Sequence, residues 1–472
     1  MIRQIIAKEI LENLLSFRFV LSLLLTILLF TVSGLVFVGR YYMQSGDYWA
    51  KTNENLTDFR GHSDQLYRLL FCKQNAWRKP KPLSLCVEGS EKSLPNCFSF
   101  DAFSAGFPQI QGRSNFTLSY FNSIDWAFII SMIFSFLALV FAYDTVSGEK
   151  EGGTLRQMLA NTIPRHHVLL GKYVGVMFTI GIPLCIGLLV SLIIVVFSHA
   201  AVISGWDWLR LLAIFVLSLL YLSIFVLLAV FVSSRTAHAA NSMVILLLVW
   251  VVFVILVPSF GRIISDALGK TPNPAELERQ LAAISADLWA HSDQFGERAG
   301  SASTDPKWPG NNPPARARLR NAVTEAQNQA REDYHNRMLA QAFDGRRLTC
   351  VSPTVAYQRV CEAIAGTGIS RCVELRRQIK EYQTTLKEYV HTKDQEDPNS
   401  LHLMFPEQSI VGAWRAISHD PVDFDAVPKF EERDFTLDQS LGLAVSDIGL
   451  LVLFNLVFFA AAWISFMRYD VR

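Results

Sequence analysis

Residues 19–38 of the 472-residue chain read FVLSLLLTILLFTVSGLVFV, a run without a charged side chain. A helix of about 20 apolar residues is long enough to cross the roughly 30 Å of hydrocarbon in a bilayer. Five further uncharged stretches have a similar length, and they cover residues 126–143, 173–197, 211–233, 241–260 and 448–467. The sequence therefore predicts an all-α polytopic membrane protein with six transmembrane helices.

The composition agrees with a membrane protein that also has large water-exposed parts. Hydrophobic residues make up 51% of the chain and charged residues only 18%, which is unusual for a soluble protein of this size. The formal net charge is +1, so the chain has no basic excess of the kind that binds nucleic acid. We expect membrane lipid, and no nucleic acid, among its partners.

The first apolar run has an alternative interpretation as a cleaved signal peptide, because Arg3, Lys8 and Arg18 precede it. A signal peptide has an apolar core of about 7–15 residues followed by a small-residue cleavage site. The run over residues 19–38 is longer, and no A-x-A site follows it. An uncleaved first transmembrane helix is the favoured interpretation.

The distribution of Lys and Arg in short loops predicts the orientation, because these residues favour the cytoplasmic side. With the N-terminus inside, the tail 468–472 is also inside, and the segments 39–125 and 261–447 face outward. The short outer loop 198–208 contains no Lys or Arg. The inner basic residues are Arg3, Lys8, Arg18, Lys150, Arg156, Arg165, Lys172, Arg235, Arg468 and Arg472. We expect a bacterial inner-membrane protein with both termini cytoplasmic and its large domains periplasmic.

The seven cysteines agree with this orientation. Cys185 lies in the third predicted span, and the others divide equally between the two outer segments: Cys72, Cys86, Cys97, Cys350, Cys361 and Cys372. Confinement to one side favours disulfides in an oxidising compartment. Full pairing of three cysteines in each segment would require at least one bridge between the segments. The alternative is that these cysteines are buried free thiols.

The soluble segments differ in their regularity. Segment 261–447 is predicted to be a mainly helical extracytoplasmic domain, because residues 274–298, 314–343 and 370–393 repeat apolar positions at helical spacing, with a loop over 299–313. Segment 39–125 is too irregular for an assignment. Residues 1–18 show the helical repeat Ile2, Ile5, Ile6, Ile10, Leu14 and Leu15. This repeat indicates a cytoplasmic interfacial helix, although a plain extension of the first span also fits.

The sequence contains no motif typical of a catalytic or cofactor site. Residues 269–271 read Gly-Lys-Thr, but Ile264 stands where a phosphate-binding loop requires glycine. His166 and His167 are adjacent and have no nearby cysteine or histidine to complete a metal site. The predicted spans contain no Asp, Glu, Lys or Arg, which disfavours a proton- or sodium-coupled carrier. Energy for any transport would therefore come from another subunit.

The loop over residues 144–172 is the candidate entry point for that energy. Its first part reads DTVSGEKEGGTLRQML over residues 144–159. Thr154 and Gln157 form a capping-box pattern, which predicts a short helix that starts there and stops before Pro164. Gly152 and Gly153 permit a tight turn ahead of it. The loop is either a polar docking surface or a plain capped surface loop.

This loop resembles the loop between the second and third spans of ABC-2 type permeases. The resemblance rests on SGEKEGGTL at 147–155, on Leu159, Pro164 and Arg165, and on LGK at 170–172. In that family the segment is a coupling helix that contacts the ATP-binding subunit. The resemblance implies that the ATPase-coupling residues are Glu149, Glu151, Gly152, Gly153, Thr154, Leu155 and Arg156. The long segments after spans one and five indicate a subgroup with large extracytoplasmic insertions.

The resemblance also implies a function. The chain would be a non-enzymatic permease subunit that pairs with a second, identical or related permease subunit and with cytoplasmic ABC ATPases. ATP and Mg would bind only to the ATPases. Export or extraction of a substrate is the expected activity. The alternatives are a non-transporting subunit that passes ATPase motion to a periplasmic partner protein, and a plain receptor or scaffold.

Overall fold

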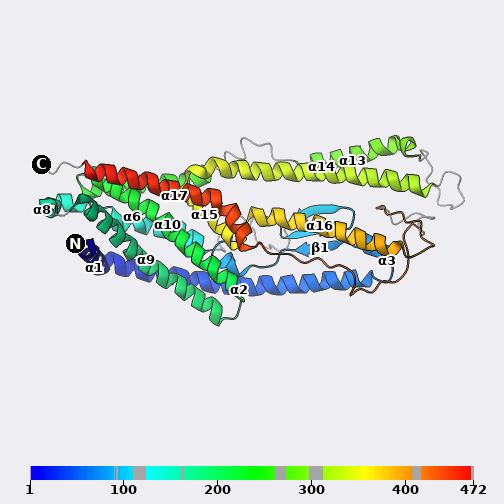
Figure 1. Cartoon of the computed structure of the whole chain (residues 1–472), viewed down its shortest axis with the longest axis horizontal. Helices are drawn as coiled ribbons and strands as arrows, with labels where there is room; N and C mark the ends of the chain where they lie inside the picture. Colours follow the sequence, from blue (N-terminus) through cyan, green and yellow to red (C-terminus); the bar gives the residue numbers. More distant parts are fainter. Residues whose placement is uncertain are drawn as a thin grey trace.

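The computed structural model describes residues 2–89, 91, 94–109, 124–160, 164–260, 273–296, 312–406 and 416–468. The molecule is elongated (Figure 1), with a helical bundle at one end and a second body of helices and strands at the other. Helix α1 and the C-terminal end of α17 lie at the same end of the bundle. The loop predicted over 299–313 and the Gly-Lys-Thr segment fall almost entirely outside the described residues.

Among the described residues, the bundle contains six helices that are long and apolar enough to cross a membrane, which confirms the predicted fold class. The first and last are α2 (Phe17–Gly61) and α17 (Leu437–Met467). The second combines α5 (Trp126–Phe128), the π-helix η3 (Ile129–Phe134) and α6 (Ser135–Ala142). The others are α9 (Arg165–Phe197), α10 (Gly205–Arg235) and α11 (Ala239–Trp250), which the π-helix η4 (Val251–Leu256) continues.

Helix α2 does not stop where its apolar run stops. It has 45 residues, and at 1.5 Å per residue it is about 67 Å long, so it reaches from the bundle far into the outer domain (Figure 1). Residues 39–61, for which the sequence allowed no assignment, are therefore helical. Hydropathy predicts where a helix leaves hydrocarbon, but a polar sequence can continue the same helix in water.

The predicted N-terminal helix is confirmed as α1 (Ile2–Leu14), which packs on α9. Glycine allows this close approach: a Cβ added at Gly175 would lie 2.7 Å from Glu9 Cβ. Further along α9, a Cβ at Gly187 would lie 2.5 Å from Phe30 Cδ2 of α2. Both distances are shorter than van der Waals contact, so α9 can hold α1 and α2 in these positions only with glycine at these sites.

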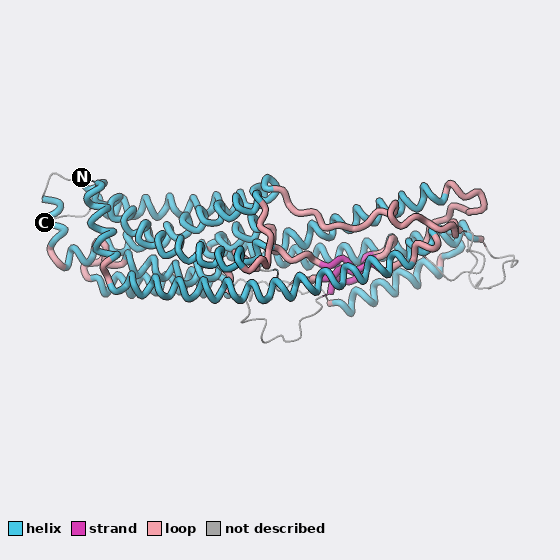
Figure 2. The backbone as a smooth tube through the Cα atoms, turned by 90° about the horizontal axis from the view of Figure 1, so that it is seen from below, coloured by secondary structure: helices cyan, strands magenta, loops and turns pink. Residues whose placement is uncertain are grey.

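The outer domain confirms the three predicted helices and adds a small sheet. The helices are α13 (Pro274–Ala290), α14 (Pro313–Leu348) and α16 (Ile369–Asp394), and α13 packs along α14. The antiparallel strands β1 (Gln74–Trp77), β2 (Cys97–Phe100) and β3 (Ala105–Gln109) pair in the order β1-β2-β3. Figure 2 shows this sheet among the helices of the outer domain. Its Phe100 ring packs against Tyr382 of α16.

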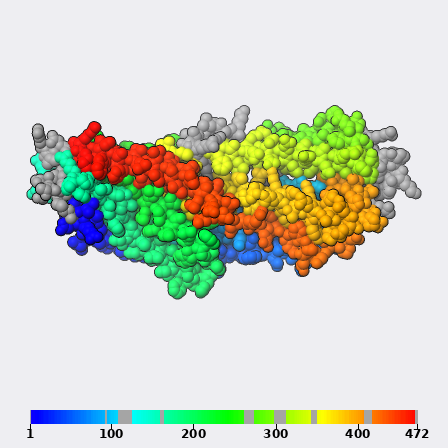
Figure 3. Space-filling model, in the orientation of Figure 1, coloured from blue at the N-terminus to red at the C-terminus, as the bar shows by residue number. Residues whose placement is uncertain are grey.

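Short helices and an extended segment complete the domain. The short helices are α3 (Leu66–Phe71), η1 (Pro82–Leu85), η5 (Ser292–Phe295) and η6 (Thr349–Val351). Residues 416–436 run in an extended path along the outer domain toward α17 (orange in Figure 3). Arg371 of α16 holds this path, because its guanidinium lies 2.7 Å from Glu432 Oε1 and 2.5 Å from Glu91 Oε1.

Helix α15 (Pro353–Ala365) packs inside the bundle against α10 and α17, which the sequence analysis did not predict. The Tyr357 hydroxyl lies 2.7 Å from Ser218 Oγ of α10, and the Tyr357 ring stacks on Tyr221 at 4.5 Å between centroids. The Tyr221 hydroxyl lies 3.0 Å from Thr354 Oγ1. Part of the segment predicted as an external domain therefore fills space between the spans.

The structure contains no disulfide among the seven cysteines, all of which it describes. The predicted bridges, including one between the two outer segments, are not formed. Cys86 and Cys361 lie in the apolar core of the bundle, and Cys72, Cys97 and Cys372 are buried in the outer domain. Burial in apolar cores accounts for these positions without oxidation, because cysteine packs as a small hydrophobic side chain.

Candidate functional site

The candidate site lies at the end of the bundle that carries α1, where the chain passes from the second span to the third (Figure 1). The loop forms two short helices, α7 (Ser147–Glu151) and α8 (Thr154–Ala160). The predicted helix at Thr154 is confirmed, whereas α7 was not expected. Gly153 makes the turn between them with φ +72°, a conformation that favours glycine. The Thr154 hydroxyl donates to the Glu149 carbonyl at 3.4 Å.

The start of α7 is attached to the end of α10. The Val146 and Ser147 amides donate to the buried hydroxyl of Ser233 at 3.1 and 2.9 Å. One side chain of the fourth span thus satisfies two amides that the first turn of a helix leaves without intrahelical partners. The start of the loop is therefore hydrogen-bonded to the C-terminal end of α10.

The end of α7 is attached to the turn between α10 and α11. The Lys150 ammonium donates to the carbonyl oxygens of Ser234 and Thr236, the latter at 3.2 Å. The Glu151 carboxylate accepts the amide of Ala239, the first residue of α11, at 3.2 Å. Lys150 thus caps carbonyls at a helix C-terminus and Glu151 caps an amide at a helix N-terminus, as the helix dipoles favour.

A buried ion triad links the loop to α1 and α9. Lys172 is 1% exposed, and its ammonium lies 2.6 Å from Glu9 Oε1 and 2.8 Å from Glu149 Oε1. Glu9 belongs to α1, Glu149 to α7 and Lys172 to α9. A buried charge is tolerated when it is paired and hydrogen-bonded, so the triad holds these three helices in one arrangement.

A second ion pair joins the first two spans beside the loop. The Arg18 guanidinium lies 2.9 Å from Asp144 Oδ2 and donates to the Tyr143 hydroxyl, also at 2.9 Å. Arg18 is in the first turn of α2, while Tyr143 and Asp144 follow α6. These polar contacts connect the first five spans to the loop or to its flanks, and α17 is connected through its Met467 carbonyl oxygen, which accepts from the Arg165 guanidinium at 2.9 Å.

The structure separates the seven predicted coupling residues into two groups. Glu149 and Leu155 point inward: the Glu149 side chain is 15% exposed beside Lys172, and Leu155 is 1% exposed in the core of the bundle. The Glu149 carboxylate is therefore paired with Lys172 in this structure, and its predicted contact with the ATPase stays a prediction. Glu151, Gly152, Gly153, Thr154 and Arg156 are exposed.

The sequence analysis missed the residues that anchor the loop. Glu9 and Ser233 were not considered as parts of the site, and Lys150 and Lys172 were noted only for their charge and as members of the loop motif. The presence of Glu9 among the apolar positions of α1 and of Lys172 at the edge of an apolar run was the available signal. Sequence gives no way to pair them, because the two residues are far apart along the chain and meet only when α1 packs on α9.

A bundle of six candidate membrane-spanning helices with a polar, multiply anchored loop at one end defines a polytopic membrane protein. The chain belongs to the ABC-2 transporter family, because the family profile described as "ABC-2 family transporter protein" matches residues 3–471. The probable ABC transporter permease protein NosY of Stutzerimonas stutzeri is 38% identical over 64 residues. This match covers 14% of the present chain and 23% of that relative.

Proposed function

We propose that this chain couples ATP hydrolysis by cytoplasmic ABC ATPases to export or extraction of a substrate, acting with a second permease subunit. The observation that carries the proposal is the Lys172 triad, because one buried cation connects the family's coupling segment to two other helices of the bundle. ATP and Mg bind to the ATPase. This chain contributes the docking surface and the moving helices.

The anchored loop defines how a push from the ATPase would spread. The exposed residues Gly152, Gly153, Thr154 and Arg156 form the surface on which the ATPase docks. Helix α7 lies directly behind this surface, and its contacts lead to the turn between α10 and α11 and to α9. A displacement of the loop therefore reaches three spans at the same time.

The proposed location is a bacterial inner membrane, with the α7–α8 end in the cytoplasm and the outer domain in the periplasm. The basic residues Arg3, Arg156 and Arg468 lie at that end and are exposed, as expected for a cytoplasmic face. The outer domain is built from the two long segments after spans one and five. The proposed position within the family is a subgroup with large extracytoplasmic insertions, and the length of these two segments supports it.

A second candidate function is transmission of ATPase motion to a periplasmic partner protein without transport. Two observations favour it. Helix α2 is one uninterrupted helix of 45 residues, so a tilt at the loop would be carried into the outer domain. Helix α15 also fills space between the spans through Tyr357 and Thr354, so a shift of α10 would be passed directly to the segment after span five.

Association with the ATPase is tested by purifying the tagged chain from its host in mild detergent and identifying copurifying proteins by mass spectrometry. We expect an ABC ATPase with the wild-type chain and its loss with Arg156→Glu on the exposed side of α8. Arg468→Glu reverses an exposed charge at the C-terminal end of α17, outside the α7–α8 loop, and serves as the control. Full recovery of the ATPase with Arg156→Glu would contradict the docking surface.

Transport is tested with inside-out vesicles from host cells that contain or lack the chain. ATP-dependent accumulation of a compound in the lumen, absent with Lys172→Met, supports export. ATP-dependent release of a protein bound to the outer domain, without accumulation of any compound, supports the second candidate.

A further inference from the structure

The outer domain has a wide polar cleft that the proposed function does not use. Its volume is about 1340 Å³, and the C-terminal half of the long helix α2, the residues around α3, and β1 form its walls. Charged and amide side chains line it, among them Lys51, Asn55, Asp58, His62 and Lys73. A solvent-open cleft with these groups is suited to a small polar ligand or an ion.

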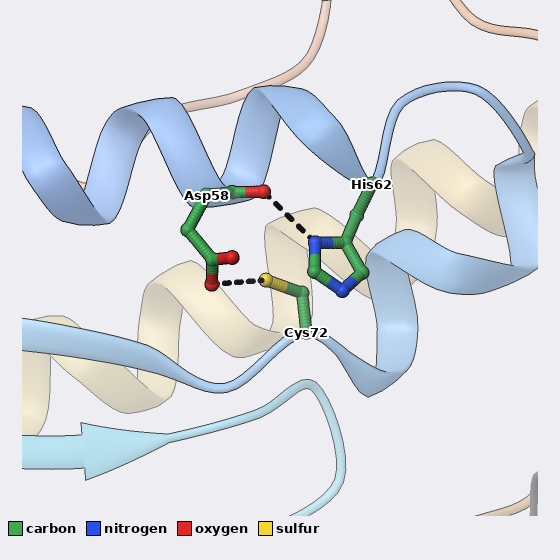
Figure 4. Close-up of side chains that lie close together, drawn as sticks. All are labelled: Asp58, His62 and Cys72. Atoms are coloured by element: carbon green, nitrogen blue, oxygen red, sulfur yellow. Dashed lines mark hydrogen bonds between the residues drawn. The ribbon is translucent and has the colours of Figure 1, made fainter.

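Three side chains with metal-binding atoms meet beside this cleft. Asp58 and His62 come from the end of α2, and Cys72 follows α3 (Figure 4). Each offers one ligand atom, and these atoms all lie within 4.8 Å of one another. The Asp58 Oδ2 atom lies 4.0 Å from Cys72 Sγ. Asp58 is exposed, His62 half-buried and Cys72 buried.

The hydrogen bond of His62 prepares its ring to bind a cation. The Nδ1 atom lies 2.8 Å from the backbone carbonyl oxygen of Asp58. A carbonyl oxygen only accepts, so Nδ1 carries the proton and Nε2 of the neutral ring keeps its lone pair. Histidines that bind metals commonly donate their other ring N–H to a carbonyl or carboxylate in this way.

A second Asp–His pair in the same domain shows that the Asp58–His62 contact by itself is a common local arrangement. At the end of α13, His291 Nδ1 lies 2.9 Å from the Asp287 carbonyl oxygen and 3.5 Å from the Asp287 carboxylate. This is the same Asp–His spacing at a helix C-terminus. Among the described residues, no third metal-binding side chain joins that pair. Cys72 therefore distinguishes the pair at the end of α2 from a common local arrangement.

We propose that Asp58, His62 and Cys72 bind one divalent ion of the zinc class. Thiolate, imidazole and carboxylate are the ligands that zinc takes in proteins, and three protein ligands leave a fourth position open. Bonds of about 2.0–2.3 Å place tetrahedral ligands roughly 3.5 Å apart, so the three side chains must move together by about 1 Å and the His62 ring must turn its Nε2 toward the other two ligands. The exposed Asp58 side chain has room for this shift, and the fourth position faces water or a ligand in the cleft.

The test uses the full-length chain in lipid nanodiscs, stripped of metal and titrated with Co²⁺ under reducing conditions. We expect one Co²⁺ per chain, a thiolate-to-cobalt charge-transfer band, and displacement of the cobalt by Zn²⁺. The band reports cysteine ligation in the unmodified protein, so this result does not depend on any variant being folded. Absence of the band, or a band that Zn²⁺ does not remove, would overturn the proposal.

Variants assign the ligands. Cys72→Ser is expected to abolish the band, and Asp58→Asn and His62→Asn to weaken Co²⁺ binding by roughly tenfold or more, as loss of groups at a metal site does. His291→Asn is the matched control and is expected to bind as the wild type does. A band that persists in Cys72→Ser, or equal weakening by His62→Asn and His291→Asn, would refute the assignment. Circular dichroism checks that each variant is folded.

Discussion

Replacing Lys172 with methionine tests the structural basis of the coupling proposal. The substitution keeps the length of the side chain and removes the cation that lies 2.6 Å from Glu9 and 2.8 Å from Glu149. The two carboxylates, with side chains 10% and 15% exposed, then lie near each other without a counter-charge. Removal of one partner from a buried ion pair costs about 3–5 kcal/mol.

We expect the loss of stability to appear first in the helices that the triad joins. Because Lys172 is the shared partner of α1 and α7, hydrogen–deuterium exchange of Lys172→Met in nanodiscs should increase over residues 2–14 and 144–160. Exchange in α16 of the outer domain should not change. The thermal midpoint should fall by several degrees, and the ATPase activity of the copurified complex should fall with it.

Two further variants make the result specific. The triple variant Glu9→Gln, Glu149→Gln and Lys172→Met removes the unpaired charges, and it should regain most of the lost stability. Lys380→Met removes the cation from an exposed pair with Glu332, whose side chains are 48% and 47% exposed, and should cost less than about 1 kcal/mol. Wild-type exchange and midpoint in Lys172→Met would refute the role of the triad, and so would a triple variant that is no more stable than Lys172→Met.

Three other predictions concern single contacts. Glu151→Lys should lose the hydrogen bond to the Ala239 amide, which should lower the free energy of unfolding by about 1 kcal/mol and reduce the amount of copurifying ATPase. Glu151→Gln keeps a hydrogen-bond acceptor and should retain the ATPase. Equal losses of ATPase in the two variants would contradict the capping role. Gly175→Ala should destabilise the chain by about 1–3 kcal/mol, because the new Cβ would lie 2.7 Å from Glu9 Cβ. Gly181→Ala on the same helix should be tolerated, because the nearest atom to its new Cβ lies at 4.0 Å. The thermal midpoints of the two variants measure the difference. Burial and the nearby Arg376 lower the pKa of His335 in the folded chain to about 4, whereas in the unfolded chain it is about 6.5. Between pH 6.5 and pH 4, the unfolded chain therefore binds a proton at this histidine that the folded chain does not bind. Stability should therefore be complete above pH 6.5 and fall by about 2 kcal/mol as the pH is lowered to 4, with allowance for partial exposure, and His335→Gln should remove this part of the pH dependence of the thermal midpoint.

The sequence by itself determined the features that depend on local chemistry. Six uncharged runs predicted six spans, because crossing hydrocarbon requires a continuous apolar helix. Helical periodicity predicted α1, α13, α14 and α16, and Gly152–Gly153 predicted the turn before α8. The loop motif also identified the family, because the match lies within one short stretch of residues.

Tertiary structure alone decided which distant residues meet and which surfaces are covered. Glu149 resembles a surface acid in the sequence, but folding buries it against Lys172, because α1 packs on α9 and brings Glu9 to the same cation. Helix α15 has 13 residues, too few to cross a membrane, so its place among the spans depends on contacts with α10 and α17. Asp58 and His62 are one helical turn apart, but only the path of the chain through α3 brings Cys72 beside them. Local patterns determine helices and turns, whereas the pairing of charges and ligands across the fold depends on packing, which the order of residues along the chain does not display.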